Sequence, residues 1–511
     1  MQPMTERSIE IGDRPLTAQD VTAIARTAVS VRLGVSARAR IARSHETLQR
    51  LAGGGTAIYG VNTGLGAAVD TKVAGEEQAV QRRIPLARAV GVGRRASREE
   101  VRAIIAARLA RCATGHSGMS VTTVEALMAL LNRGVHPVVP MSGSIGEADL
   151  APLAHIACVL SGSGDAESAG EVTSAAMALQ RAGLQPAMLG GKDGLALVSS
   201  NAASVGVAAL VLVDAAQVLR ALLAAAALSF EGYRANLGPL RPSATQLRPV
   251  PGQSEVCAAL LSALENGDLA RPGGARRLQD PLSFRCVGPV YGACFAALRA
   301  ASDIVALELD SSDDNPAILA ESNQSLPNAN FDATHLSLTF EALGLAFARV
   351  AASCGERLMK LMSPSSSELP RFLSPIQEGR NGFATVQKTI ASLAAEVQHR
   401  AAPMPVVIMP VADRVEDYAT MALQVVEKTG EIVQRLRLLA AIELMVAAQA
   451  CDLRSGVTLG SGSSKVLAAV RSVVARLHDD RPSTPDIEAL DAIIRSGVFD
   501  SLFPLSLGPD T

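Results

Sequence analysis

The chain of 511 residues contains no tryptophan and few other aromatic residues, with four tyrosines and ten phenylalanines. Its core must therefore be built from aliphatic side chains, and alanine and leucine fill the apolar positions, which favours closely packed helices over sheets. An excess of charge is also missing, since the formal net charge is -2. Such balance argues against nucleic acid as the main partner.

Metal-binding and secretion signals are missing as well. The seven cysteines are widely spaced and form no CxxC pair or Cys/His cluster, so we expect reduced, buried thiols and no metal site. The first residues, MQPMTERSIEIGDRPL, contain no apolar signal core, and we expect a cytoplasmic protein. The longest apolar stretch, 205–230, carries Asp214, Gln217 and Arg220 on one helical face, which favours a core helix over a membrane span.

What is present is mainly a helical pattern. Residues 9–11 predict a short strand and residues 17–29 a helix, so the N-terminal portion is expected to be small and α/β. From residue 99 onward the apolar residues repeat with the period of a helix. The predicted helices are 99–113, 119–133, 148–161, 194–231, 254–266, 287–308, 335–363, 382–400, 416–451, 463–477 and 486–496.

Several of these helices are long for a globular protein, since a helix of ~36 residues spans about 54 Å. Long helices with short connections predict a mainly α fold built on a long-helix bundle. We expect residues 1–190 to form an N-terminal domain, and residues 191–511 to form the bundle and a C-terminal helical part.

The polar loops between the predicted helices carry a series of motifs. In chain order they read YGVNTGLG at 59–66, GSIGEADLAPLAH at 143–155, GLALVSSNA at 194–202, QDPLSFRC at 279–286, ELDSSDDNP at 308–316, NANF at 328–331 and VEDYATM at 415–421. Together they resemble the motifs of the histidine/phenylalanine ammonia-lyase family, in the same order and over most of the chain. The resemblance implies the helical fold of ammonia-lyase and fumarase-like enzymes, and a homotetramer whose active sites are shared between subunits.

One motif lacks the residues from which that family makes its prosthetic group. In the family, Ala-Ser-Gly cyclises into a methylidene-imidazolone electrophile, the electron sink to which the substrate's amino group is attached. Here only Glu147 and Ala148 lie between Gly146 and Asp149. Without a serine no alkene can form by dehydration, so we expect no electrophile and no other cofactor.

Other motif positions are retained. Tyr59, Arg285, Phe331 and Glu416 stand at places that match the family's pattern. The resemblance implies that Tyr59 is the catalytic base, although a free tyrosine has a pKa of ~10 and needs hydrogen-bonding or cationic neighbours to act as one. It also implies that Arg285 binds the substrate carboxylate as a bidentate pair, with a structural ion pair to Asp280 or Asp314 as the alternative.

Further positions depart from the family's pattern. Ser199 replaces the asparagine that supports the electrophile, and Arg88 replaces the histidine that contacts the substrate ring. Tyr418 replaces a histidine in the last motif, and Leu282 replaces a tyrosine in QDPYSLRC. Ser199 and Arg88 remain candidate substrate contacts, although a surface ion pair would also explain Arg88.

Lys388 is a candidate of another kind. It lies in a predicted helix whose core positions are Phe383, Val386, Ile390 and Leu393. A lysine near that inward face would be costly unless it were paired, so we expect a functional role. The alternative is a lysine that extends to the surface.

A quaternary ammonium group needs no electrophile, because it leaves as neutral trimethylamine. Electrophile-free relatives eliminate trimethylamine from ergothioneine to give thiourocanate, and the resemblance implies this reaction on a betaine. Tyr59 would take the proton from the carbon next to the ring, while Lys388 and Glu416 would address the thioimidazole and make it withdraw electrons. Aromatic candidates for contact with the cation are Phe331, Phe383 and Tyr59 itself.

Two other readings stay open. The enzyme could act on another betaine such as hercynine, or the chain could be an inactive scaffold. Retention of Tyr59, Arg285 and Glu416 argues against a scaffold, because an inactive site has no use for a base, a carboxylate clamp and an acid.

The missing serine predicts a measurable absence. The purified chain should have the mass of its unmodified sequence, because cyclisation to the electrophile would release water. Intact-mass spectrometry measures this directly, and a mass lower by the lost water would refute the electrophile-free interpretation.

Overall fold

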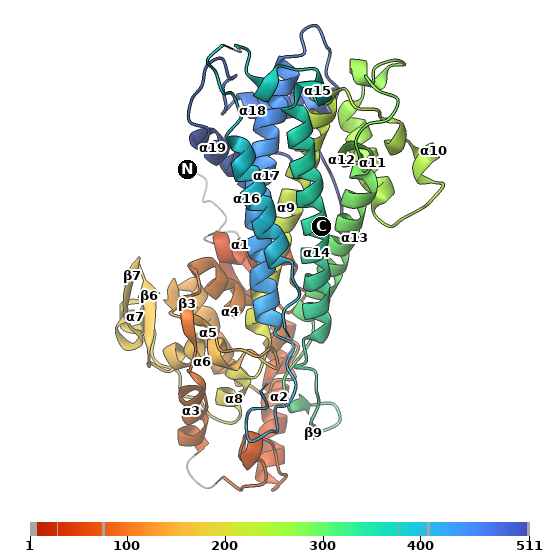
Figure 1. Ribbon diagram of the computed structural model, residues 1–511. Helices are drawn as coiled ribbons and strands as arrows, with labels where there is room; N and C mark the ends of the chain where they lie inside the picture. The colour runs from red at the N-terminus through yellow and green to blue at the C-terminus, as the bar shows by residue number, and fades with distance from the viewer. Residues whose placement is uncertain (1–7, 28, 74–76, 377, 406–408, 508–511) are drawn as a thin grey trace, which may run out of the picture. The chain divides into compact units, whose positions relative to one another are not determined.

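The computed structural model describes residues 8–27, 29–73, 77–376, 378–405 and 409–507 and is mainly helical (Figure 1). The chain forms two compact units. Unit 1 comprises Met1–Leu210, Ser302–Leu338 and Met404–Glu427, and unit 2 comprises Val211–Ala301, Thr339–Pro403 and Lys428–Thr511. Each unit joins segments that are far apart in the sequence, so neither coincides with residues 1–190 or 191–511, and that division stays a prediction.

Unit 1 combines helices with very small sheets. Its helices are α1 (Ala18–Arg26), α2 (Val35–Gly53), α3 (Glu77–Arg88), α4 (Arg98–Ala113), α5 (Val121–Asn132), α6 (Leu150–Leu160), α7 (Ala175–Arg181) and α8 (Asp193–Val198). Its strands are β1 (Ser8–Ile11), β2 (Ser30–Leu33), β3 (Val92–Arg95), β4 (Val135–Pro137), β5 (Pro140–Ser142), β6 (Asp165–Ser168), β7 (Glu171–Ser174), β8 (Ala317–Leu319) and β9 (Gln324–Leu326). Strands β1 and β2 pair in parallel, whereas β3–β5, β4–β6–β7 and β8–β9 are antiparallel.

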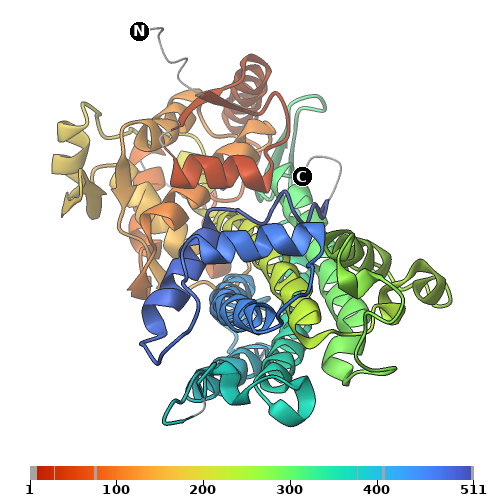
Figure 2. The ribbon, with the colours of Figure 1, turned by 90° about the horizontal axis from the view of Figure 1, so that it is seen from above.

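Long helices dominate unit 2. Four helices have residues in both units: α9 (Ala202–Tyr233), α13 (Val287–Leu309), α14 (Thr334–Leu361) and α17 (Ala422–Asp452). Helices of unit 2 alone are α10 (Pro242–Thr245), α11 (Gln253–Leu264), α12 (Leu282–Arg285), α15 (Pro364–Ser367), α16 (Val386–Arg400), α18 (Ser461–Arg471) and α19 (Thr484–Arg495). Within unit 2 the long helices lie side by side in Figure 1, and Figure 2 shows them nearly end-on.

A buried ion pair joins the long helices inside unit 2. Arg357 on α14 donates to both carboxylate oxygens of Glu443 on α17, at 2.8 and 2.9 Å. Glu443 also accepts from Ser229 on α9 at 2.7 Å, and Arg357 donates to the hydroxyl of Tyr291 on α13 at 2.5 Å. The long helices therefore share one polar centre within an aliphatic core, and such a network specifies how their side chains meet.

Capping residues explain where the first helices begin. Thr17 and Ser97 precede α1 and α4, and their hydroxyls accept the backbone N–H groups of Asp20 and Glu100. The carboxylates of Asp20 and Glu100 in turn accept the N–H groups of Thr17 and Ser97. These reciprocal bonds satisfy donors that a helix N-terminus otherwise leaves unpaired.

The predicted bundle is confirmed. The predicted bounds of the helices 194–231 and 416–451 differ from those in the structure. The predicted helix 194–231 is interrupted at residues 199–201, between α8 and α9. There the hydroxyl of Ser200 and the N–H of Asn201 bind the carboxylate of Asp313 instead of extending a helix. The predicted helix 416–451 begins only at Ala422, so Glu416 lies in a loop before α17.

Helices α2 and α3 are not predicted by the sequence pattern. The buried face of α2 includes Ser44 and Thr47 between Ile41 and Leu48, so its stripe does not read as apolar. Helix α3 contains Pro85, which ordinarily argues against a helix because proline lacks a backbone donor.

Among the residues that the structure describes, three segments have the length and apolar composition of a membrane span: Asp193–Tyr233, Val287–Leu309 and Thr334–Leu361. In the first, 94% of the most apolar window is buried inside the protein, so core packing accounts for its composition. The expectation of a core helix at 205–230 is therefore confirmed. In the other two, 50% and 56% of the window is buried, which leaves leucines such as Leu307 and Leu338 exposed.

Two arginines of α4 hold the loops on which the candidate site is built. The side chain of Arg108 is 2% exposed and forms a bidentate pair with Asp314 at 2.8 and 3.2 Å. Arg111 forms an ion pair with Asp313 at 2.8 Å. Since Asp313 also accepts the N–H of Asn201 at 2.5 Å, α4 secures both the 313–314 turn and the break between α8 and α9.

Substitution Arg108→Met tests this role. It leaves the carboxylate of Asp314 buried without its main partner, so we expect a loss of about 3–5 kcal/mol in the free energy of unfolding. Titration with a denaturant, followed by a signal that reports the unfolding of unit 1, measures this loss in the free energy of unfolding. The control is Arg181→Gln, which removes an exposed ion pair with Glu171 and should cost about 0–1 kcal/mol. Equal losses in both variants would contradict the assignment.

Candidate active site

Tyr59 lies in the loop after α2, and its side chain is half-buried. The loop is folded by its own polar groups, since the N–H of Ile58 donates to Asn62 Oδ1 at 2.7 Å. The backbone N–H of Gly66 donates to the Tyr59 hydroxyl oxygen at 2.8 Å, from a residue with a φ of 56° that suits glycine. A donor at this oxygen stabilises negative charge there, which a tyrosine base requires.

Gln81 ties the Tyr59 loop to neighbouring helices. Its fully buried side chain, on α3, donates to the carbonyl of Gly60 at 2.9 Å. Its carbonyl oxygen accepts the N–H of Leu195 on α8 at 3.3 Å. The position of Tyr59 is therefore set by α3 and α8 as well as by its own loop.

Arg88 brings three of the expected site residues together. It ends α3 and is half-buried, and its Nη1 donates to the carbonyl of Ile84 at 3.3 Å. Burial lowers the pKa of the Arg88 guanidinium, while the phenol of Tyr59 and the carboxylate of Glu416 oppose that shift by favouring its charged form. Tyr59 and Glu416 thus each lie close enough to Arg88 to act on its charge, and all three residues belong to unit 1.

The turn at residues 146–149 is held by hydrogen bonds on both sides. The hydroxyl of Thr420 donates to the carbonyl of Gly146 at 2.7 Å. Asn201 accepts the N–H of Ala148 at 3.1 Å and donates to the carbonyl of Phe331 at 2.5 Å. The turn is therefore fastened to the segments before α17, before α9 and before α14.

The residues of this turn do not fit a methylidene-imidazolone. Gly146 has a φ of 84°, and a Cβ there would lie 2.1 Å from the Thr420 hydroxyl. The fully buried Asp149 accepts the N–H of Ser204 at 2.7 Å and the hydroxyl of Ser144 at 2.8 Å, so it caps α9. Between them stand Glu147 and Ala148, and neither can lose water to form an alkene.

Glu147 gives the turn an acidic side chain in an unusual state. Burial, together with Asp332 and Glu416, raises the pKa of the Glu147 carboxyl from 4.5 to about 8. Its Oε1 is buried and has no hydrogen-bond partner in the part of the chain that the structure describes. At neutral pH the turn therefore presents a mostly protonated carboxyl beside two other acids.

Ser199 and Phe331 also lie in unit 1. Ser199 is the residue at the break between α8 and α9, is 9% exposed, and donates its N–H to the carbonyl of Leu195 at 2.9 Å. Phe331 is half-buried, and its carbonyl accepts from Asn201. Both candidates therefore border the turn at 146–149 through Asn201.

The remaining expected residues lie in unit 2. Arg285 ends α12, is half-buried and donates to Gln279. Asp314, one alternative partner for Arg285, is instead bound by Arg108. The expected burial of Lys388 is wrong: it lies on the exposed side of α16, whose apolar stripe faces inward without it, and Phe383 is buried at 3% exposure.

Several residues near Tyr59 and the turn were not singled out from the sequence. They are Gln81, Asn201 and Asp332, while Glu147 and Tyr418 were noted only as departures from a motif. These departures were the signal in the sequence that could have identified Glu147 and Tyr418. An acid in the turn where the family forms its electrophile, and a tyrosine in place of a histidine, both change the chemistry of a site. Gln81 and Asn201 act through backbone contacts that no spacing in the sequence reveals.

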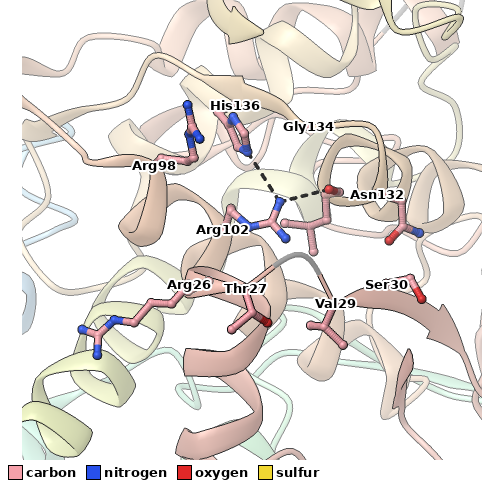
Figure 3. Close-up of a pocket in the computed structure, with 11 residues that line it drawn as sticks. Arg26, Thr27, Val29, Ser30, Arg98, Arg102, Asn132, Gly134 and His136 are labelled. Carbon is pink, nitrogen blue, oxygen red and sulfur yellow. Dashed lines mark hydrogen bonds between the residues drawn. The ribbon is translucent and has the colours of Figure 1, made fainter. Parts of the chain in front are cut away.

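Two cavities of unit 1 are lined by residues other than Tyr59, Arg88 and Glu416. One of about 470 Å³ is lined by Arg26, Arg98, Arg102 and His136 (Figure 3). The buried Arg102 is satisfied there by backbone carbonyls, including that of Leu131 at 3.0 Å. The other, of about 720 Å³, has Asp332 in its wall. Among the described residues no group of three or more His, Cys, Asp or Glu could hold a metal ion.

A helical bundle that gathers a loop tyrosine, an arginine and a glutamate around a GSIGEADLAPLAH turn belongs to the carbon–nitrogen lyases. The chain is a member of the aromatic amino acid lyase family, whose pattern it matches over residues 16–472. The expected fold and the expected resemblance are both confirmed.

Relatives within the family are similar over nearly their whole length. Histidine ammonia-lyase of Gloeobacter violaceus is 36% identical over 487 residues, which covers 94% of this chain and 95% of the relative. The solved ergothionase of Treponema denticola, an ergothioneine degrading enzyme, is 32% identical with a TM-score of 0.89 and covers 96% of this chain and 99% of its own. Histidine ammonia-lyase of Trypanosoma cruzi is 25% identical, with a TM-score of 0.90 and coverages of 97% and 95%.

The state of Glu147 predicts a pH-dependent stability. A carboxyl with a pKa of about 8 keeps its proton in the folded protein at pH values where the unfolded chain has lost it, so the native protein loses stability as pH rises from 4.5 to about 8. Glu147→Gln removes that loss. The Tm of this variant relative to wild type should therefore increase between pH about 5 and about 9, as thermal unfolding can measure.

The matched control is Glu171→Gln on the exposed strand β7. Its Tm difference from wild type should be small and independent of pH. A constant difference for Glu147→Gln over the same range would mean that Glu147 ionises normally.

Proposed function

We propose that this lyase eliminates trimethylamine from ergothioneine to give thiourocanate, without a methylidene-imidazolone electrophile. The observation that carries the proposal is the turn at 146–149, which holds a carboxyl where the family forms its electrophile. The charge of Glu416 acts on this carboxyl and also on Arg88. The similarity to the ergothioneine degrading enzyme of Treponema denticola supports it.

The chemistry follows from the charge of the leaving group. Trimethylammonium is permanently cationic, so when its carbon–nitrogen bond breaks the bonding pair stays on nitrogen and neutral trimethylamine departs. The enzyme must also remove the proton on the carbon next to the ring, and the bonding pair of that C–H bond becomes the new double bond. Tyr59 is the proposed base, and the N–H of Gly66 supports the charge that its oxygen carries.

The other proposed roles divide between carboxylate and ring. Arg285 binds the substrate carboxylate as a bidentate pair. Lys388 and Glu416 interact with the thioimidazole ring of the substrate. The ring then withdraws electrons and makes the neighbouring C–H group more acidic. The proposed substrate contacts are Arg88, Phe331, Phe383 and Ser199.

A homotetramer with shared sites belongs to the same proposal. Lys388 is exposed in the chain, which suits a residue that contributes to a site formed between subunits. The half-buried α13 and α14 expose Leu307, Leu338 and Leu345, an apolar surface suited to another subunit. The match to enzymes of this family supports a soluble protein, and we place it in the cytoplasm with a small betaine as its only partner besides itself.

Purified protein mixed with ergothioneine should release trimethylamine and gain the ultraviolet absorbance of a conjugated product, because elimination creates a double bond next to the ring. L-histidine should be inert, since without an electrophile its amino group cannot leave. Turnover of hercynine but not ergothioneine would select the other betaine, and no reaction with any betaine would favour an inactive scaffold.

Tyr59→Phe identifies the base within the same assay. It removes only the hydroxyl that accepts from Gly66, so the fold and Tm should persist while turnover falls by about 10²–10⁴-fold. Retained activity would exclude Tyr59 as the base. Tyr233→Phe is the control, because that hydroxyl lies at Ser366, in unit 2.

A further inference from the structure

Glu147, Asp332 and Tyr418 come from three distant parts of the sequence and meet in unit 1. We propose that their side chains form a binding site for a quaternary ammonium group, the leaving group of the substrate. This inference deepens the proposed function and rests on it for the identity of the leaving group.

Glu147 and Asp332 face each other directly. Their backbones form an isolated antiparallel bridge, and their carboxyl groups share a hydrogen bond. Because ionised carboxylates only accept, this bond requires a proton on one of them. The buried Oε1 of Glu147 has no partner among the described residues. An unsatisfied buried carboxyl oxygen is costly, and a bound cation would compensate it.

Tyr418 is attached to the same pair through Thr334. The N–H and the hydroxyl of Thr334 both donate to the Asp332 carboxylate at 3.0 Å. The Thr334 hydroxyl also lies 3.0 Å from the Tyr418 hydroxyl. Since Thr334 has already given its one hydroxyl proton to Asp332, Tyr418 is the donor in this contact. The bond orients a ring that is 50% exposed and free to face a ligand.

These groups match what a quaternary ammonium needs. It has no N–H to donate, and its charge is spread over methyl groups, so it is bound by negative charge and by aromatic faces. Asp332 and Tyr418 offer one of each, and Glu147 adds a second carboxyl. Asp332 also lines the cavity of about 720 Å³, so this member of the group borders space for a small organic ion.

The surrounding charges favour a zwitterion in one orientation. Asp332 and Glu416 are the charged groups that act on Glu147, and Tyr59 and Glu416 are the groups that act on Arg88. If the ammonium group of the substrate lies at Glu147 and the electron-rich end of the substrate points toward Arg88, each end meets a group of opposite charge. A cation also favours ionised Glu147, so binding should tighten as pH rises through its pKa of about 8.

The position of the site agrees with the chemistry of the turn. The family's electrophile, which attaches to the substrate nitrogen, forms in the turn that here holds Glu147. Thr420 and Asn201 fasten that turn through its backbone, so the carboxyl is in place before a ligand arrives. Tyr418, another departure from the family's motifs, is linked to Asp332 through the hydroxyl of Thr334.

Tetramethylammonium chloride tests the site without turnover. We expect it to raise the Tm of the wild-type protein more than sodium chloride at equal concentration, with affinity rising between pH about 7 and about 9. Glu147→Gln should lose this pH dependence. Tyr418→Leu should weaken binding roughly tenfold, whereas Tyr418→Phe keeps the ring and most of the affinity. Glu171→Gln, on exposed β7, should bind like wild type.

An affinity that is equal in wild type, Glu147→Gln and Tyr418→Leu overturns the proposal, as does the absence of any effect specific to tetramethylammonium. If Glu147→Gln does not fold, the comparison of Tyr418→Leu with Tyr418→Phe decides, because both lack the hydroxyl and only one lacks the ring.

Kinetics separates this inference from the proposed function. If ergothioneine is turned over, Glu147→Gln and Tyr418→Leu should raise KM about tenfold with a smaller change in kcat. Unchanged KM in both variants refutes the leaving-group site and leaves the reaction standing. Tetramethylammonium binding that depends on Glu147, in a protein that turns over no betaine, refutes the reaction and leaves the cation site standing.

Discussion

The buried carboxylate of Asp313 is the contact on which the candidate site depends. It pairs with Arg111 on α4, and it accepts from Ser200 and from the N–H of Asn201 where α8 gives way to α9. Asn201 then binds the N–H of Ala148 in the electrophile turn. The interruption between α8 and α9 would otherwise leave buried polar groups without partners. Here these groups bind Asp313 and the N–H of Ala148, and they thereby support the site.

The resulting site separates charge. Tyr59 and Glu416 act on the charge of Arg88, while Glu147 forms an acidic pair with Asp332 and is also acted on by Glu416. In the family an electrophile makes the nitrogen a leaving group by covalent attachment. In this chain the same turn offers only a carboxyl, which can attract a nitrogen that is already a good leaving group but cannot activate one that is not. That change of chemistry is the reason for proposing a permanently cationic substrate and not an amino acid.

Sequence and structure agree best where local pattern decides the outcome. The helical period predicted the long helices, and the predicted helix 17–29 covers α1, because capping and amphipathic packing depend on neighbouring residues. Lys388 shows the limit of this reasoning. Its spacing suggested an inward face, yet the apolar stripe of α16 does not include it and its side chain is exposed. A helical wheel gives the relative positions of residues around a helix, but it does not show which neighbours cover them.

The sequence by itself determined the fold class, the family and the absence of serine between Gly146 and Asp149. The expectation of an electrophile-free turn follows from covalent chemistry alone, because a turn without serine cannot be dehydrated whatever surrounds it. Only the tertiary structure decided that Glu147 meets Asp332, that Tyr418 reaches them through Thr334, and that Arg88 meets Glu416. Those residues are distant along the chain, and the ionisation of a carboxyl depends on burial and on neighbouring charges that exist only once the chain has folded.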